Sequence, residues 1–279
     1  MKALRWVRLT GGVVAALLLL LWLTLMMIDP ADIFGVVTRI AARQGVSVTA
    51  KSITRRSPLG LRMESVSITS DRPILTIDRL DLQIPILPLL TGTPTARLTG
   101  RVGEGSFTIT AVGRTTPVVT IDARHIRLER IPLIAETLSG TVTGGVSVSG
   151  TVTGIPPKAR GEIRIDSRGI ETRGITIGGV TLPDSIYRSF RGALTVSGDK
   201  LDVTSFSLDG EGIYLRLSGS IPLSPPIMSA PLSLTLEILP RPEIVERQKL
   251  VFLLLSRYLT SPGSYRLPLS GTLASPRIF

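Results

Sequence analysis

The sequence of 279 residues contains no cysteine and only one histidine, His125. The lack of cysteine excludes disulfide scaffolds, thiol nucleophiles, cysteine-ligated zinc and iron–sulfur clusters. The single histidine lies between Arg124 and Arg127 in a run of alternating apolar and polar residues, which is typical of an exposed strand residue rather than a catalytic base. We therefore expect a protein that is not an enzyme and that uses no metal ion or other cofactor.

Aromatic residues are also scarce, at 4% of the chain, whereas glycine (27 residues) and proline (20 residues) are abundant. With many threonines, serines, valines and isoleucines, this composition favours short strands joined by turns and disfavours a helical bundle. The sequence has no series of aromatic rings on which bases could stack, and its arginines are dispersed. We therefore expect no nucleic-acid partner.

The net charge of +11 comes almost entirely from arginine, because only five of the 32 basic residues are lysine. An excess of this sign suits phosphate-bearing partners such as anionic lipid headgroups. The alternative is a solvated, arginine-rich surface, since the arginines alternate along expected strands and form no dense run. The sequence leaves both interpretations open.

One long stretch, residues 9–28, carries no charge at all. As a helix, these twenty residues span about 30 Å, the thickness of a bilayer core. The stretch is longer than the apolar region of a cleavable signal peptide and lacks a small-residue cleavage site. We expect an uncleaved transmembrane anchor over residues 9–28, in preference to a buried helix of a soluble protein. Its central residues are Leu17, Leu18, Leu19, Leu20, Leu21 and Trp22.

The charges on either side of this segment predict its orientation. Lys2, Arg5 and Arg8 precede it, and Asp29 and Asp32 follow it. The positive-inside rule then places residues 1–8 in the cytoplasm and residues 29–279 across the membrane. With a short basic end and no second apolar span, we expect a single-pass protein of the bacterial inner membrane, in contact with its lipids, whose bulk lies in the periplasm.

A helix is expected directly after the anchor. Asp29 is a suitable N-cap, Pro30 occupies the first helical position, apolar residues recur at helical spacing from 33 to 41, and Gly45 follows. Its wide apolar stripe favours packing at the end of a β layer over a role as a lever between membrane and domain.

From Val46 onward the apolar residues recur with a period of two, which predicts strands. The apolar residues change from odd-numbered to even-numbered positions near Glu64 and Ser65, and again between Ile77 and Leu80. Such a change indicates β-bulges. Glycine clusters at 103–105, 144–145, 198–199 and 210–212 favour tight reversals between antiparallel strands. We expect a long antiparallel meander with one apolar face. Its later strands are expected at 96–102, 106–112, 118–128, 141–152, 159–165, 175–182, 193–196, 201–208, 213–221, 232–238 and 267–273.

A weak repeat runs through these strands. It consists of an apolar residue, Ser or Thr, Gly, any residue and an apolar residue, at irregular spacing, which disfavours a fixed-period solenoid or propeller. The pattern fits related hairpins in which glycine permits bends or close backbone approach. Its glycines are Gly100, Gly140, Gly150, Gly219 and Gly271.

Two further helices are expected within the β-rich part. One covers about two turns at 132–138, and a longer one covers 243–259. The longer helix contains six consecutive apolar residues, 250–255, which cover every side of a helix. They either enter the protein's own core or contact a lipid or partner. The candidate contact residues are Val251, Phe252, Leu254 and Leu255.

The order of these features resembles the AsmA-like periplasmic proteins. After the anchor and the short helix come PLGLRMESV (58–66), ILTIDRL (74–80) and LLTGTP (89–94), and the chain closes with LSGTLASP (269–276). The single anchor and the length are most similar to the type II secretion system protein N branch of that superfamily. These motifs describe strands and turns rather than a reactive site.

The resemblance implies an elongated, curved, mostly antiparallel sheet with a few short helices packed on it. It implies a noncatalytic inner-membrane component of a type II secretion system, with other proteins of that system as partners. The wider superfamily implies an alternative, a lipid-binding or lipid-transfer module whose apolar groove takes phospholipid or lipopolysaccharide. The resemblance supplies no catalytic residues.

Overall fold

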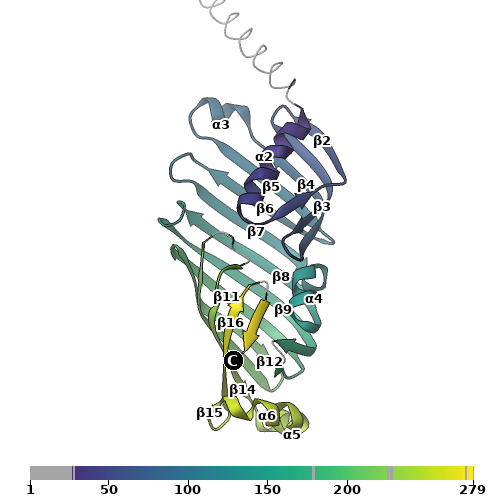
Figure 1. Ribbon diagram of the computed structural model, residues 1–279, viewed down its shortest axis with the longest axis vertical. Coiled ribbons are helices and arrows are strands. Elements are labelled where there is room, and N and C mark those ends of the chain that lie inside the picture. The colour runs from purple at the N-terminus through teal and green to yellow at the C-terminus, as the bar shows by residue number, and fades with distance from the viewer. Residues whose placement is uncertain are drawn as a thin grey trace, which may run out of the picture.

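The computed structural model describes residue 27 and residues 29–279, except 178, 179, 225, 227, 228, 274 and 279. It is mainly β, as predicted: one large antiparallel sheet carries a few short helices and forms an elongated, curved body (Figure 1). The strands are β1 (Ser47–Thr49), β2 (Ser52–Ser57), β3 (Gly60–Thr69), β4 (Pro73–Gln83), β5 (Thr95–Val102), β6 (Gly105–Val112), β7 (Val118–Arg127), β8 (Ser139–Thr153), β9 (Ala159–Ile177), β10 (Val180–Thr181), β11 (Ser185–Gly198), β12 (Lys200–Gly210), β13 (Ile213–Pro222), β14 (Ser233–Pro240), β15 (Leu259–Ser261), β16 (Ser264–Thr272) and β17 (Ser275–Ile278).

The sheet is a meander, in which most strands pair with the next one along the chain. The short strands β1 and β2 both pair with β3, and pairing then continues in order from β3 to β9. β11 joins β9, and the series ends through β12, β13, β14, β16 and β17. The sheet curls so far that β17 contacts β9, which lies several strands away (Figure 1). This curl encloses the apolar face.

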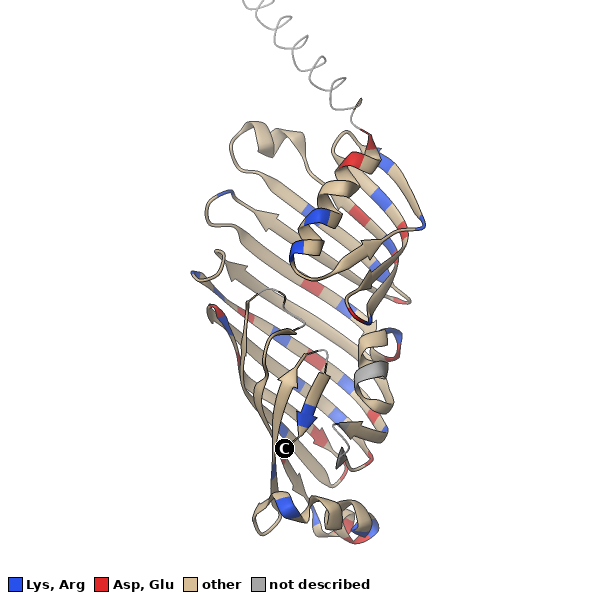
Figure 2. Cartoon of the chain, in the orientation of Figure 1, with Lys and Arg blue, Asp and Glu red and all other residues tan. Residues whose placement is uncertain are grey.

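Most of the buried residues form one apolar cluster along the inner face of the curl, and Ile221, Ala230 and Leu232 form a second, smaller one. The larger cluster runs from Leu61 and Met63 on β3, through Tyr187 on β11, to Ile238 on β14 and Leu267 on β16, all almost fully buried. Because side chains alternate between the two faces of a strand, the charged residues of these strands lie on the outer face. Figure 2 shows both signs of charge distributed over the strands and turns.

The predicted change of parity near Glu64 and Ser65 is confirmed, but it is not a bulge that adds a residue, because β3 and β4 keep the same register through this point. Ser65 has a φ of 50°, in the left-handed region, and it separates two inward-facing sets of residues. Before it, Met63 pairs with Leu80, and after it, Val66 pairs with Ile77. In both strands the inward-facing residues therefore change from odd-numbered to even-numbered positions at the same place in the pairing. This explains the change that the sequence also shows between Ile77 and Leu80.

Similar irregularities recur on later strands. His125 has a φ of 55° at the point where the pairing of β7 with β8 shifts, and Gly169 and Gly174 have φ values of 68° and 60° within β9. Two predictions were wrong for this reason. Gly144 and Gly145 lie inside β8 at a register shift rather than in a turn, and the expected strand 159–165 and the start of the expected strand 175–182 belong to one long strand, β9, while residues 180–181 form β10. Glycine bends these strands without ending them.

Three glycines of the sheet lie under aromatic rings on the neighbouring strand. Gly100 pairs with Phe107, Gly192 with Phe206, and Gly210 with Tyr187. A Cβ atom at Gly192 would lie 2.8 Å from Cδ2 of Phe206. The ring occupies the space that a side chain would fill, an arrangement that compensates for glycine in a strand.

The first helix is confirmed. The helix α2 (Pro30–Arg43) begins after Asp29, whose carboxylate accepts a hydrogen bond of 2.8 Å from the Ala31 amide, and Gly45 follows it with a φ of 73°. α2 lies against β1, β2 and β3, and Ile33 and Phe34 pack on the core. The described contacts therefore fit the expected packing on the sheet.

Of the other helices, α4 (Pro132–Thr137) was predicted and α3 (Ile86–Leu90) was not. The expected long helix 243–259 was wrong in extent. It is divided into α5 (Pro242–Arg247), α6 (Lys249–Leu255), a 3-10 turn (Ser256–Tyr258) and β15. The break lies at Gln248, whose side chain accepts a hydrogen bond from the Asp184 amide at 3.0 Å and donates one to the Asp184 carbonyl at 2.9 Å.

The expected anchor, residues 9–28, lies outside the described residues except for Met27. Within the part of the chain that the structure describes, no helix combines the length and apolar character needed to cross a bilayer.

The aromatic cover over Gly192 gives a direct test of the packing. We expect Gly192→Ala to lower the free energy of unfolding by about 1–3 kcal/mol, because its methyl group would displace Phe206 from its packing on Phe190. The control is Gly145→Ala, whose Cβ would meet no atom within 4 Å. It should leave stability unchanged or raise it by up to about 1 kcal/mol. Denaturant unfolding of both variants measures the difference, and equal losses would contradict the packing described.

Candidate functional site

An apolar cleft opens on the inner face of the sheet, between β8 and β13. Its volume is about 380 Å³, within the range of roughly 300–1,000 Å³ that is typical of small-molecule sites. We call it the apolar cleft. It is lined by Leu128, Ile134, Leu138, Val142, Val146, Val148, Ile165, Ile170, Thr172, Ile175, Leu182, Pro183, Tyr187, Phe190, Phe206, Leu208 and Leu215.

Alternation along four neighbouring strands builds the floor of the apolar cleft. Val148 on β8 pairs with Ile165 on β9, so their side chains stand on the same inner face. Phe190 on β11 meets Phe206 on β12 edge to face, with ring centroids 4.6 Å apart. Val148, Ile165 and Phe206 are only partly buried although they pack on the core. Part of their apolar surface is therefore open to a ligand.

The chemistry of the lining restricts what this cleft can bind. No charged side chain lines it in the described structure, and Thr172 and Tyr187 are the hydroxyl-bearing residues among its lining. Tyr187 is 1% exposed. Burial raises the pKa of its hydroxyl to about 12, and the interaction with Thr172 offsets only part of this effect. The cleft therefore offers apolar contact, which suits a hydrocarbon chain, and no group for acid–base or nucleophilic chemistry at neutral pH.

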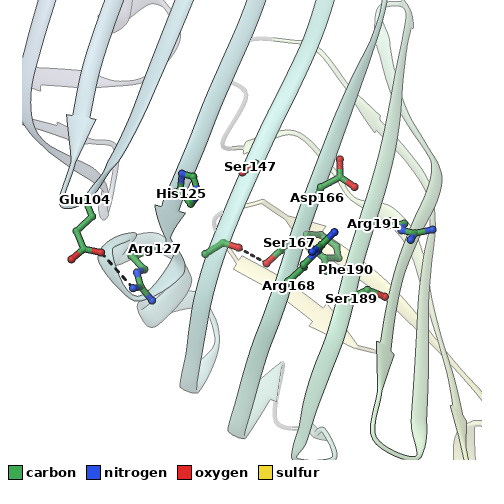
Figure 3. Close-up of a pocket in the computed structure, with 11 residues that line it drawn as sticks. Glu104, His125, Arg127, Ser147, Asp166, Ser167, Arg168, Ser189, Phe190 and Arg191 are labelled. Carbon is green, nitrogen blue, oxygen red and sulfur yellow. Dashed lines mark hydrogen bonds and ion pairs between the residues drawn. The ribbon is translucent and has the colours of Figure 1, made fainter.

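A second hollow, of about 690 Å³, is lined mainly by polar and charged residues (Figure 3). It lies beside the register shifts between β7 and β8 and between β8 and β9. Ser147, Asp166 and Arg191 line it and alternate with residues of the inner face, so it opens mainly on the outer face of the sheet. Its contacts are a hydrogen bond from Ser167 to the Gly145 carbonyl and an ion pair of 3.4 Å between Arg127 and Glu104.

His125 lines this polar hollow and is exposed. Glu104 and Asp166 are the acids that line the polar hollow, and among the described residues no hydrogen bond joins either of them to His125. In the described ranges, no three His, Asp or Glu side chains gather where they could hold a metal ion. The residues that line this hollow therefore do not include a nucleophile, a base and an orienting acid that are joined by hydrogen bonds.

Many of the arginines form ion pairs on the outer face. Arg124 pairs with Asp122 and Arg164 with Glu162, in each case two residues apart on one strand. Asp81 has two partners, Arg56 at 2.7 Å and Arg62 at 2.8 Å. Burial alone would raise the pKa of Asp81, but the hydrogen bonds from Arg62 and Arg56 outweigh it and lower the pKa. These contacts fit the solvated, arginine-rich surface, which was one of the two interpretations left open by the sequence.

The four candidate contact residues of the 250–255 segment have different surroundings. Phe252 and Leu255 are buried in the protein's own core, where Phe252 packs 5.4 Å from the ring of Tyr265. Val251 is half-buried against the core, and Leu254 is 65% exposed. In this conformation a lipid or partner would reach Leu254 but not Phe252 or Leu255. Burial in the protein's own core thus applies to Phe252 and Leu255, and contact with a lipid or partner stays a prediction for the exposed side of α6.

The strand pattern did not predict the apolar cleft; an apolar groove was expected only from the resemblance, which did not say which strands would line it. The sequence also did not distinguish Leu250 and Leu253, which are exposed, from their buried neighbours. The local signal for α3 was present, since residues 84–94 lack any charge.

Comparison with known proteins adds no relative. The chain matches no protein-family model, no curated protein and no solved structure. The fold, the two hollows and the sequence motifs are therefore the features that bear on function.

The raised pKa of Tyr187 predicts a pH effect on stability. An unfolded tyrosine ionises near pH 10.0, whereas folded Tyr187 ionises near pH 12. Between these values the folded chain holds one more proton than the unfolded chain, so the free energy of unfolding falls as pH rises. Tyr187→Phe should remove this component of the pH dependence, and also the late phase in an ultraviolet titration of the four tyrosines. A titration of the wild-type chain with all phenols ionising together would contradict the burial described.

Proposed function

We propose that the chain is a noncatalytic component of a type II protein secretion system, held in the bacterial inner membrane by residues 9–28 with its sheet in the periplasm. The order of elements along the chain carries this proposal. The motif at 58–66 forms the turn into β3 and its first half, up to the irregularity at Ser65, the motif at 74–80 lies in β4, and the closing motif at 269–276 joins β16 to β17. The segments that resemble AsmA-like proteins thus lie at the start and at the end of one meander, and the length and the expected single anchor favour that branch.

The described residues are consistent with a role in binding or assembly. The two hollows described above are an apolar cleft without charged side chains and an open polar hollow without a catalytic set. A protein of this kind acts by holding partners or lipids in place.

A second candidate function is lipid binding, and the apolar cleft favours it. A cleft of about 380 Å³ lined by leucine, isoleucine, valine and phenylalanine suits a hydrocarbon chain. Burying such a chain contributes about 0.8 kcal/mol for each methylene group removed from water. Lipid binding and membership of a secretion system are compatible, because a component of the assembly can carry a lipid.

The first proposal is tested by purification from the native bacterium. We expect the tagged full-length chain, extracted in mild detergent, to retain inner-membrane platform proteins of the secretion apparatus, identified by mass spectrometry. Deletion of its gene should lower the amount of exported folded protein in the medium, and the restored gene should recover it. A tagged, unrelated single-pass protein of the same membrane is the control. Unchanged export after deletion, with no platform protein retained, would contradict the proposal.

The second proposal is tested by native mass spectrometry of the full-length chain in mild detergent. We expect the wild-type protein to carry a phospholipid. Val148→Trp should lose it, because the indole would fill the apolar cleft from β8. The control is Ser149→Trp, which places the same side chain on the exposed outer face of the same strand. Lipid-free wild-type protein, or equal lipid occupancy in both variants, would argue against binding in the cleft.

A further inference from the structure

The loop between β4 and β5 has an unusual composition for an exposed segment. Residues 84–94 contain no charged side chain, and they include α3. Leu87 is 72% exposed and Leu90 54% exposed, and Leu89 lies beside them with 45% exposed. Figure 2 shows α3 as a segment free of charged residues. Three neighbouring leucines therefore face solvent in the structure described.

The neighbouring turn extends this surface. The Gly113 amide donates a 2.9 Å hydrogen bond to the Pro94 carbonyl, which ties the turn between β6 and β7 to the α3 loop. Val112 and Val118 pair with each other at the base of that turn, and both are exposed. Arg114 lies between them. We call Leu87, Leu89, Leu90, Val112, Arg114 and Val118 the α3 surface.

Acidic residues are absent from this region of the sequence. Between Asp81 and Asp122 the single acid is Glu104. Glu104 belongs to the turn at the opposite ends of β5 and β6, where Val102 pairs with Gly105. The α3 surface thus combines exposed leucines and valines with one arginine, a composition that favours the interface of an anionic bilayer.

The backbone of α3 is also suited to an apolar environment. The Thr91 amide and hydroxyl both donate to the Leu87 carbonyl, at 3.1 and 3.2 Å, and the Thr93 amide donates to the Pro88 carbonyl at 2.9 Å. Pro85 and Pro88 have no N–H group to satisfy. Because an unpaired backbone group is costly in hydrocarbon, carbonyls that are paired within the loop lower the cost of inserting it.

The position of the α3 surface in the fold indicates which membrane it would contact. α3 and the start of α2 lie at the same end of the elongated body (Figure 1). The chain that precedes α2 contains the uncharged residues 9–28, the expected membrane anchor. A bilayer crossed by that segment would therefore lie beside α3.

We propose that the α3 surface inserts into the interface of the same bilayer that holds the anchor, with Leu87 and Leu90 among the acyl chains and Arg114 at the phosphates. Two contacts with one membrane fix the tilt of the elongated domain, whereas an anchor alone leaves it free to swing. This inference rests on the anchored orientation of the proposed function, and it adds a membrane-binding site to it.

The opposite end of the molecule supplies a matched control. On α6, Leu250 is 77% exposed, but Lys249 and Arg247 precede it and Glu246 is close in sequence. α6 lies at the end of the body away from α3 (Figure 1). Leu250 therefore matches Leu87 in residue type and exposure and differs in position.

The experiment uses the absence of cysteine from the chain. Leu87→Cys and Leu250→Cys are made separately in the full-length protein, labelled with an environment-sensitive fluorophore and reconstituted into vesicles of phosphatidylethanolamine and phosphatidylglycerol. Circular dichroism checks that each variant keeps the β-rich fold. We expect the label at 87 to shift its emission to the blue and to be quenched by nitroxide-bearing lipids. The label at 250 should show neither effect.

Each outcome decides one part of the inference. If the protein floats with the vesicles and the label at 87 is not quenched, the α3 surface does not insert and this inference fails while the anchor stands. If the protein does not float with the vesicles, the anchor fails and the inference fails with it. Quenching at 250 instead of 87 would place the other end of the body at the bilayer and would also overturn it. If the apolar contact drives insertion, adding Leu90→Asp to the chain labelled at position 87 should abolish the quenching of that label.

Discussion

Burial of a single apolar face is the constraint on which the rest of this structure depends. A sheet with one apolar and one charged face must cover the apolar face, and few helices are available to do so. The sheet covers this face by curling on itself. As a result, β17 contacts β9, and strands far apart in the sequence share one core. Where the curl does not bring side chains into full contact, half-buried apolar residues remain, and these line the apolar cleft.

The irregularities of the strands follow from the same constraint. A long strand that keeps strict alternation cannot bend sharply, whereas a bulge adds a residue and changes its direction. His125 and Gly169 adopt positive φ at such points, Ser65 adopts it where the register is kept, and on either side of each the apolar residues still face inward. The glycines under Phe107, Phe206 and Tyr187 allow large rings to lie flat across neighbouring strands. Because His125 serves this geometry and is exposed, the one histidine has a structural explanation.

Much of the fold could be predicted from the sequence because its signals are local. The cap at Asp29 and Pro30 depends on adjacent residues, and the slip at Ser65 is visible as a change of parity. The failures arose where distant contacts decide the outcome. The helix expected at 243–259 breaks because Gln248 bonds to the Asp184 backbone, 64 residues away, and Gly144 stays within a strand because β9 pairs along its whole length. The apolar cleft depends on how several strands curl together, which no local pattern encodes.

The proposed roles join these features in one molecule: an anchor before α2, an apolar surface at α3 beside the membrane, and a curved sheet with an open apolar cleft further along the body. The central claim is that the inner face of this sheet is open to hydrocarbon at that cleft. It is tested most directly by photo-crosslinking the full-length protein with a phospholipid that carries a photoreactive group in its acyl chain, followed by peptide mapping. We predict crosslinks on inward-facing residues of β8, β9, β11 and β12. Crosslinks spread equally over both faces of these strands, or absent from all four, would contradict the account.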